Sequence, residues 1–83
     1  MVRRSSLEAA VGLSELVEAG IDGIRRHPTA WPVWPGHPDV RRRVLRRFPY
    51  SVISLLERDE ITIVAVAHHR RRPGYWLQRL RPR

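Results

Sequence analysis

The segment from Tyr50 to His69 constrains the fold most strongly. It holds two largely apolar runs, YSVISLLE and ITIVAVAHH, separated only by the tripeptide RDE. The second run is rich in β-branched residues, which is typical of a strand, and so short a connection joins antiparallel neighbours. An earlier run, residues 40–48, alternates imperfectly between apolar side chains and arginine. The sequence therefore predicts a three-stranded antiparallel meander over residues 40–69.

An amphipathic helix is predicted before these strands, over residues 6–27. Ser5 and Glu8 have the spacing of a capping box, in which each side chain satisfies a free backbone N–H of the other residue. His27-Pro28 ends the helix, because a residue before proline avoids helical geometry. Three glycines weaken the helix by about 1 kcal/mol each, so we expect it to depend on packing against the sheet. The apolar stripe at helical spacing consists of Leu13, Leu16, Val17, Ile21 and Ile24.

Residues 28–39, PTAWPVWPGHPD, form a proline-rich connector between the helix and the strands. Its prolines disfavour regular structure, and we expect Trp31 and Trp34 to pack it against the body of the protein. The sequence thus predicts one α+β domain, with a long N-terminal helix packed on the three-stranded meander. Residues 70–83 follow as a basic tail.

Both faces of the last predicted strand are mostly apolar, because side chains alternate along a strand. One helix covers only one face of a sheet, so we expect another chain or a missing segment to cover the second face. The residues predicted on one face are Ile61, Ile63, Ala65 and Ala67, and those on the other are Thr62, Val64, Val66 and His68.

Positive charge dominates the second half of the chain. Sixteen basic residues, all arginine, face eight acidic residues, which gives a formal net charge of +8. Arginine favours bidentate contact with phosphate or carboxylate, so an anionic partner is expected, either nucleic acid or an acidic protein segment. The absence of cysteine fits a reducing cytoplasm, and no apolar run is long enough to span a membrane. We therefore expect a cytoplasmic protein without a membrane partner.

The segment VAHHRRRPGYW is the candidate site. Adjacent histidines on a strand point to opposite faces, so His68 and His69 do not share a metal ion, and we expect no metal or other cofactor. The serines stand in no activated context, so nucleophilic catalysis is not expected. Acid–base cleavage of RNA needs a base, an acid and cations, which this segment contains. The candidate catalytic residues are His68, His69, Arg70 and Tyr75, and the candidate RNA-binding or partner-binding residues are Arg42, Arg46, Arg47, Arg71, Arg72 and Trp76. From the residues alone, contact with a partner or solvation is favoured over catalysis.

The stretches VRRRVLRRFPYSVI and ITIVAVAHHRRRPGYW, with ELVEAGIDGIRRHPTAWPVWPG before them, closely resemble the ParE/RelE family of type II toxin–antitoxin toxins, also called plasmid-stabilisation proteins. The resemblance covers about residues 13–80. Family members begin with a strand and a helix that this chain lacks, so we expect an N-terminally truncated version of that fold. RelE-type ribonucleases carry a basic residue in the middle strand, where this chain has Ser51.

The resemblance implies a toxin that is neutralised by an acidic, partly disordered antitoxin, with which it forms a hetero-oligomer. The toxin would inhibit growth by acting on DNA gyrase or another target. The alternative is a ribosome-dependent mRNA endoribonuclease, with His68 or His69 as base, Tyr75 in support and Arg70 to Arg72 on the phosphate. A third possibility is a degenerate, non-toxic remnant that only binds antitoxin. Whether the chain is an enzyme stays open at this point.

Overall fold

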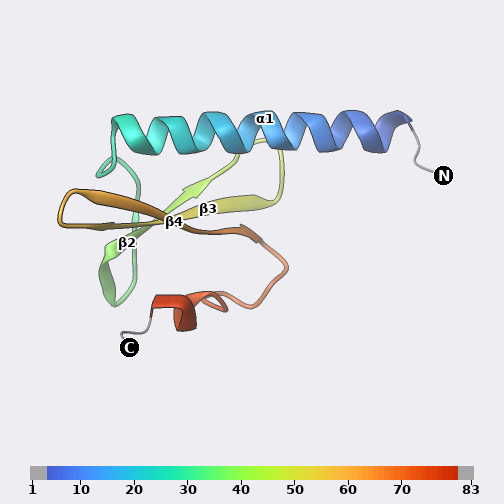
Figure 1. Ribbon diagram of the computed structural model, residues 1–83. Coiled ribbons are helices and arrows are strands. Elements are labelled where there is room, and N and C mark those ends of the chain that lie inside the picture. Colours follow the sequence, from blue (N-terminus) through green and yellow to red (C-terminus); the bar gives the residue numbers. More distant parts are fainter. Residues whose placement is uncertain (1–3, 81–83) are drawn as a thin grey trace.

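The computed structural model describes residues 4–80 and confirms the α+β class (Figure 1). All neighbouring strands are antiparallel, and the strand order in the sheet is β1-β2-β3-β4. The elements in chain order are the helix α1 (Arg4–Arg26), the strands β1 (Val33–Trp34), β2 (His37–Val44), β3 (Tyr50–Glu57) and β4 (Glu60–His68), and a short 3-10 helix, η1 (Leu77–Leu80).

The proline-rich connector supplies a fourth strand, so the prediction of three strands was one short. Val33 pairs with Arg41 and Trp34 with His37 across a turn in which Gly36 has a φ of 80°. β2 also begins inside the predicted connector, at His37. Proline is tolerated at the edge of a sheet, where its missing N–H leaves no ladder position empty. The connector therefore forms a short edge hairpin rather than an irregular linker.

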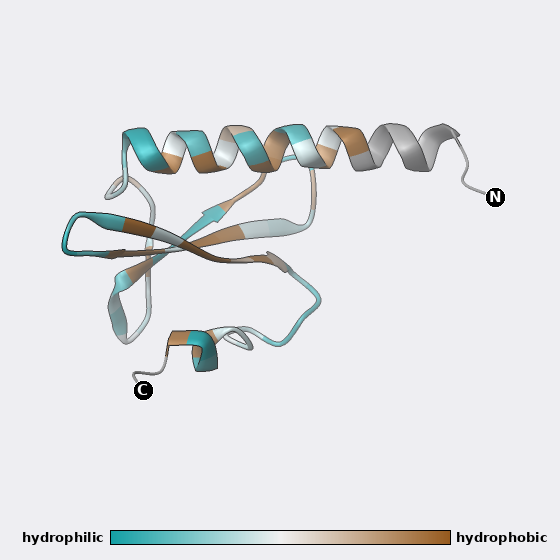
Figure 2. Ribbon diagram, viewed as in Figure 1, coloured by the Kyte–Doolittle hydropathy of each residue, from teal (hydrophilic) through white to brown (hydrophobic). Residues whose placement is uncertain are grey.

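The helix α1 lies across one face of the sheet and turns its apolar side toward it (Figure 2). Ile24 of the helix packs there with Leu45 and Val52 in one of two buried cores. Because α1 begins at Arg4, Ser5 lies inside the helix, and the predicted capping interaction with Glu8 lies outside the described side chains. In the described part of the chain, no helix is long and apolar enough to cross a membrane.

The chain's own C-terminal segment, residues 70–80, covers the second face of the sheet (Figure 1). Trp76 of this segment is only 1% exposed and contacts Trp34 edge to face, with 4.9 Å between ring centroids. The prediction that another chain or a missing segment covers this face was wrong. The tail supplies the cover because Trp76 and its apolar neighbours pack on a core made of Val40, Ile53, Ala65 and Ala67.

An irregularity in β4 reverses the face of the sheet to which the side chains of that strand point. Ile53 pairs with Ala65 but Ser54 pairs with Ile63, so Val64 is an extra residue, which is a β-bulge. One inserted residue reverses the alternation of side chains beyond it. Ile61 and Ile63 therefore pack on the helix side, while Ala65 and Ala67 pack on the tail side, so the prediction that these four share a face was wrong.

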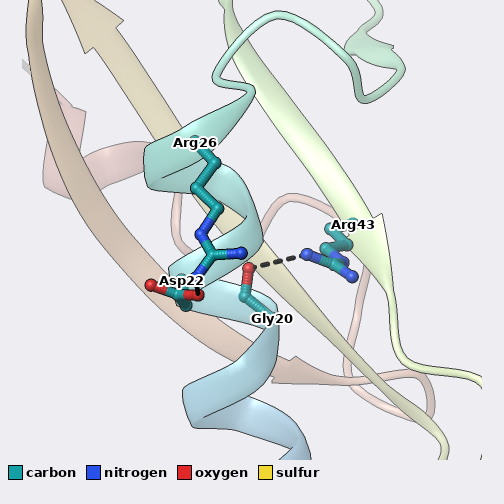
Figure 3. A network of polar contacts seen from close by, with 4 residues as sticks. All are labelled: Gly20, Asp22, Arg26 and Arg43. Carbon is teal, nitrogen blue, oxygen red and sulfur yellow. Dashed lines mark hydrogen bonds and ion pairs between the residues drawn. The ribbon is translucent and has the colours of Figure 1, made fainter.

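Arg43 of β2 contacts the helix (Figure 3) and also the connector. Its Nη1 donates a hydrogen bond of 2.9 Å to the carbonyl oxygen of Gly20 in α1. Its guanidinium carbon lies 4.1 Å from the ring centroid of Trp31, which is a cation–π contact. Nearby on the helix, Asp22 and Arg26 form an ion pair of 3.1 Å. An arginine in the strand thus contributes to the structure rather than to the basic surface.

Candidate functional site

A pocket of about 290 Å³ lies on the tail side of the sheet, where β4 ends. All the strands and the C-terminal segment contribute to it, and none of the described residues that line it is acidic. Its cationic side chains are Arg42, Arg71 and Arg72, its aromatic ones are Trp34, Tyr75 and Trp76, and its other polar ones are Ser51, His68 and His69.

The sheet itself places His69 beside Ser51. The backbone N–H of His69 donates to the carbonyl of Pro49 over 2.8 Å, which extends the β3–β4 ladder beyond the end of β4. His69 consequently lies on the same face as Ala67, which pairs with Ser51. Ser51 Oγ and His69 Nε2 are 2.8 Å apart and hydrogen-bonded. Ser51 therefore has an imidazole as its hydrogen-bond partner, a contact that the sequence alone did not predict.

His68 points to the opposite face, as the alternation along a strand predicts. Its ring packs edge to face on Tyr50, with 4.7 Å between ring centroids. Its Nδ1 accepts a hydrogen bond of 2.9 Å from the backbone N–H of Arg70. Although His68 is one of the residues that line the pocket, its imidazole is engaged by the turn and by Tyr50, so His69 is the better candidate for acid–base chemistry.

The turn after β4 returns the chain to the sheet. Gly74 has a φ of 78°, a left-handed conformation that glycine adopts without steric cost. The Pro73-Gly74 step thus reverses the chain and buries Trp76, which is 1% exposed, so the prediction of Trp76 as a binding residue was wrong. The guanidinium of Arg71 lies 4.0 Å from the ring centroid of Tyr75. This stacking fixes Tyr75 at the wall of the pocket.

Seven of the ten predicted site residues line this pocket, and three do not. Arg70 is exposed outside it, and Arg46 and Arg47 line a separate cavity beside α1. The prediction that Arg46 and Arg47 belong to the same site as the histidines was wrong. The reason is Leu45, which is 5% exposed in the core under α1 and draws the β2–β3 loop toward the helix. The residues that do line the pocket are His68, His69, Tyr75, Arg42, Arg71, Arg72 and Trp76.

Ser51 and Trp34 belong to the pocket and were not predicted as site residues. Ser51 was noted only as a departure from the RelE pattern, and Trp34 only as an anchor of the connector. The one sequence signal for Ser51 is its place in the middle strand, and nothing local indicates that His69, 18 residues later, lies beside it.

The pocket has the chemistry of a small anion site. Three guanidinium groups favour phosphate or carboxylate, which they bind through paired N–H donors. The volume lies at the lower end of the range for ligand pockets, roughly 300–1,000 Å³, which suits one small anionic group. His69 and Ser51 add an imidazole and a hydroxyl for proton transfer or bond formation. Among the described side chains, those of residues 11–80, no three metal-ligating groups lie together as an ion site.

Comparisons with known proteins add no assignment. No family model, no curated protein and no solved structure matches this chain. The relationship to ParE/RelE toxins therefore stays a prediction from the sequence motifs quoted above.

Proposed function

We propose that the chain is the toxin component of a type II toxin–antitoxin system of the ParE/RelE kind, and that a cognate acidic antitoxin neutralises it. The observation that carries the proposal is the basic pocket, with three arginines and no acidic residue among its described lining. It lies at the end of the strand motif that resembles that family. Concentrated positive charge of this kind favours a polyanionic target or partner.

The scarcity of salt bridges among the described side chains supports the same proposal. Among the described side chains, Asp22 and Arg26 form the only salt bridge, so no described carboxylate neutralises the arginines of the pocket. An acidic antitoxin segment would supply the missing carboxylates and occupy the pocket at the same time. Neutralisation then follows from covering the site, and the two chains form a hetero-oligomer.

Induced expression of this chain of 83 residues tests the proposal. We expect growth arrest that is relieved when a small acidic protein encoded beside it is co-expressed. Replacing Arg42, Arg71 and Arg72 together by Ala should relieve the arrest as well, because the pocket loses its three cations. The matched control replaces Arg25, Arg26 and Arg58, which lie outside the pocket, and it removes the same charge.

The outcomes separate the proposed targets. A DNA-damage response with trapped gyrase cleavage complexes would identify gyrase as the target. Normal growth on induction of the intact chain would contradict the toxin proposal and is what a degenerate, antitoxin-binding remnant predicts.

A second candidate function is endoribonucleolytic cleavage of mRNA on the ribosome. The observation that favours it is the position of His69 in an arginine-lined pocket with Tyr75 at the wall. An imidazole can move protons while guanidinium groups stabilise the charge of the transition state. Arrested cells should then contain codon-positioned cuts in translated messages, and His69→Ala and Tyr75→Phe should reduce them. Intact messages in arrested cells would exclude this activity.

A further inference from the structure

Ser51 and His69 form a hydrogen-bonded pair that no prediction from the sequence anticipated. Ser51 lies on β3, which has a neighbouring strand on each side, and it is only 2% exposed, yet it lines the pocket. Its Oγ is hydrogen-bonded to His69 Nε2 over 2.8 Å. A hydroxyl hydrogen-bonded to an imidazole at the wall of a cavity has the geometry of an activated nucleophile.

The chemistry of the pair depends on the direction of this hydrogen bond. In the described chain, the Ser51 hydroxyl has no hydrogen-bond partner other than His69 Nε2. A nucleophilic role requires the hydroxyl to donate its hydrogen to Nε2, which it does when the imidazole carries its own proton on Nδ1. In this tautomer the free lone pair of the ring is directed at the proton that a nucleophilic serine must lose.

We propose that Ser51 is a nucleophile and His69 its general base, in a site that transfers the phosphorus of a phosphodiester to the serine oxygen. The substrate class follows from the lining of the pocket. Arg42, Arg71 and Arg72 suit a phosphodiester anion and the additional negative charge that develops on its oxygens during attack. No carboxylate among the described lining residues repels that charge.

The step balances without a further reactant. Ser51 Oγ forms a bond to phosphorus while His69 Nε2 accepts the hydroxyl proton. The bond from phosphorus to the leaving oxygen breaks, and the imidazolium returns its proton to that oxygen, which departs as an alcohol. Water then attacks the serine phosphodiester by the reverse route, with His69 again as base, and restores the hydroxyl.

This inference concerns the same pocket as the proposed function but does not depend on it. Because the protein supplies the nucleophile, the substrate needs no 2′-hydroxyl, in contrast to cleavage in which His69 would deprotonate the RNA itself. The proposed chemistry therefore extends to phosphodiesters that lack a ribose. It can be measured with a small molecule, away from ribosomes, gyrase and antitoxin.

The experiment incubates the full chain with bis(p-nitrophenyl) phosphate. We expect release of p-nitrophenol, and a mass gain of one p-nitrophenyl phosphoryl group that peptide mapping places on Ser51. Ser51→Ala should abolish both signals. His69→Gln can still bond the serine but accepts no proton from it, and it should slow release by about 10²-fold or more.

Ser54→Ala is the matched control. Ser54 lies on the same strand, is equally buried at 4% exposed, and does not line the pocket. This variant should release p-nitrophenol at the rate of the unchanged chain. Circular dichroism checks that every variant is folded. If Ser51→Ala does not fold, Ser51→Cys replaces it, and the adduct should then move to the thiol.

Three results would overturn the proposal. They are a folded chain without p-nitrophenol release above background, an adduct on a residue other than Ser51, and undiminished release by folded Ser51→Ala. Failure of the toxin proposal looks different, because cells expressing the chain would grow while the purified chain still forms the adduct. Arrest of growth without any adduct would leave the toxin proposal standing and remove this one.

Discussion

At the scale of single residues, identical side chains in neighbouring positions have different tasks. Arg42 and Arg43 are adjacent in β2, and the alternation of the strand sends them to opposite faces. Arg42 lines the pocket, whereas Arg43 bonds Gly20 and stacks on Trp31. The sequence RRR therefore does not describe a uniform basic surface.

Two glycines of α1 give a prediction that tests the structural role of Arg43. A Cβ at Gly12 would lie 3.6 Å from Phe48 Cζ, an ordinary van der Waals contact, so Gly12→Ala should stabilise the protein by about 0.5–1 kcal/mol through helix propensity. A Cβ at Gly23 would collide with the guanidinium of Arg43 and displace it from Gly20 and Trp31. Gly23→Ala should therefore give no gain or a net loss. Urea denaturation of both variants measures the two free energies of unfolding, and an equal gain at both positions would contradict the role assigned to Arg43.

At the scale of elements, the β3–β4 hairpin closes with residues that are poorly suited to its turn. Arg58 has a φ of 51° and Asp59 a φ of 65°, and in the described chain they are the only non-glycine residues with positive φ. A two-residue turn with both central residues left-handed matches the right-handed twist of the strands, and Asn-Gly is the pair that adopts it most readily. The hairpin thus forms because the strands pair, and not because the turn residues favour it.

Replacing Arg58-Asp59 by Asn-Gly should therefore raise the free energy of unfolding by about 1 kcal/mol. Thermal denaturation measures the change. The same dipeptide placed at residues 46–47, where neither φ is positive, serves as control and should destabilise the protein, because glycine adds entropy to the unfolded chain. A gain of the same size at both places would argue against a strained turn.

At the scale of the whole molecule, the protein consists of a helix, a sheet and a C-terminal segment in three layers (Figure 1). The segment after β4 has a double role, because it completes the second core through Trp76 and also forms the wall of the pocket. Stability and the candidate site are consequently coupled on this face.

Trp76→Ala should cost about 3–5 kcal/mol, because it empties the centre of the second core. A domain of this size has a total stability of only about 4–12 kcal/mol, so much of the chain should unfold at 37 °C. Trp76→Phe keeps part of the buried area and should be milder. Urea denaturation followed by circular dichroism measures both changes, and a fully stable Trp76→Ala variant would show that the tail does not belong to the core.

The sequence by itself determined the presence of the helix and of the three long strands, although the first of these strands is His37–Val44 rather than residues 40–48. These features follow from local periodicity and backbone preference, which act within a few residues of each other. It also determined the charge, and hence the expectation of an anionic partner.

Only the tertiary structure decided which residues share a face and which meet. The bulge at Val64 exchanges the faces of β4, and the carbonyl of Val64 accepts a hydrogen bond of 3.0 Å from Arg79 in η1, an interaction between distant segments. The tail covers the face that was expected to need a partner. Ser51 meets His69 because the strand register places them together, and register is set by packing on both faces of the sheet at once rather than by any local pattern.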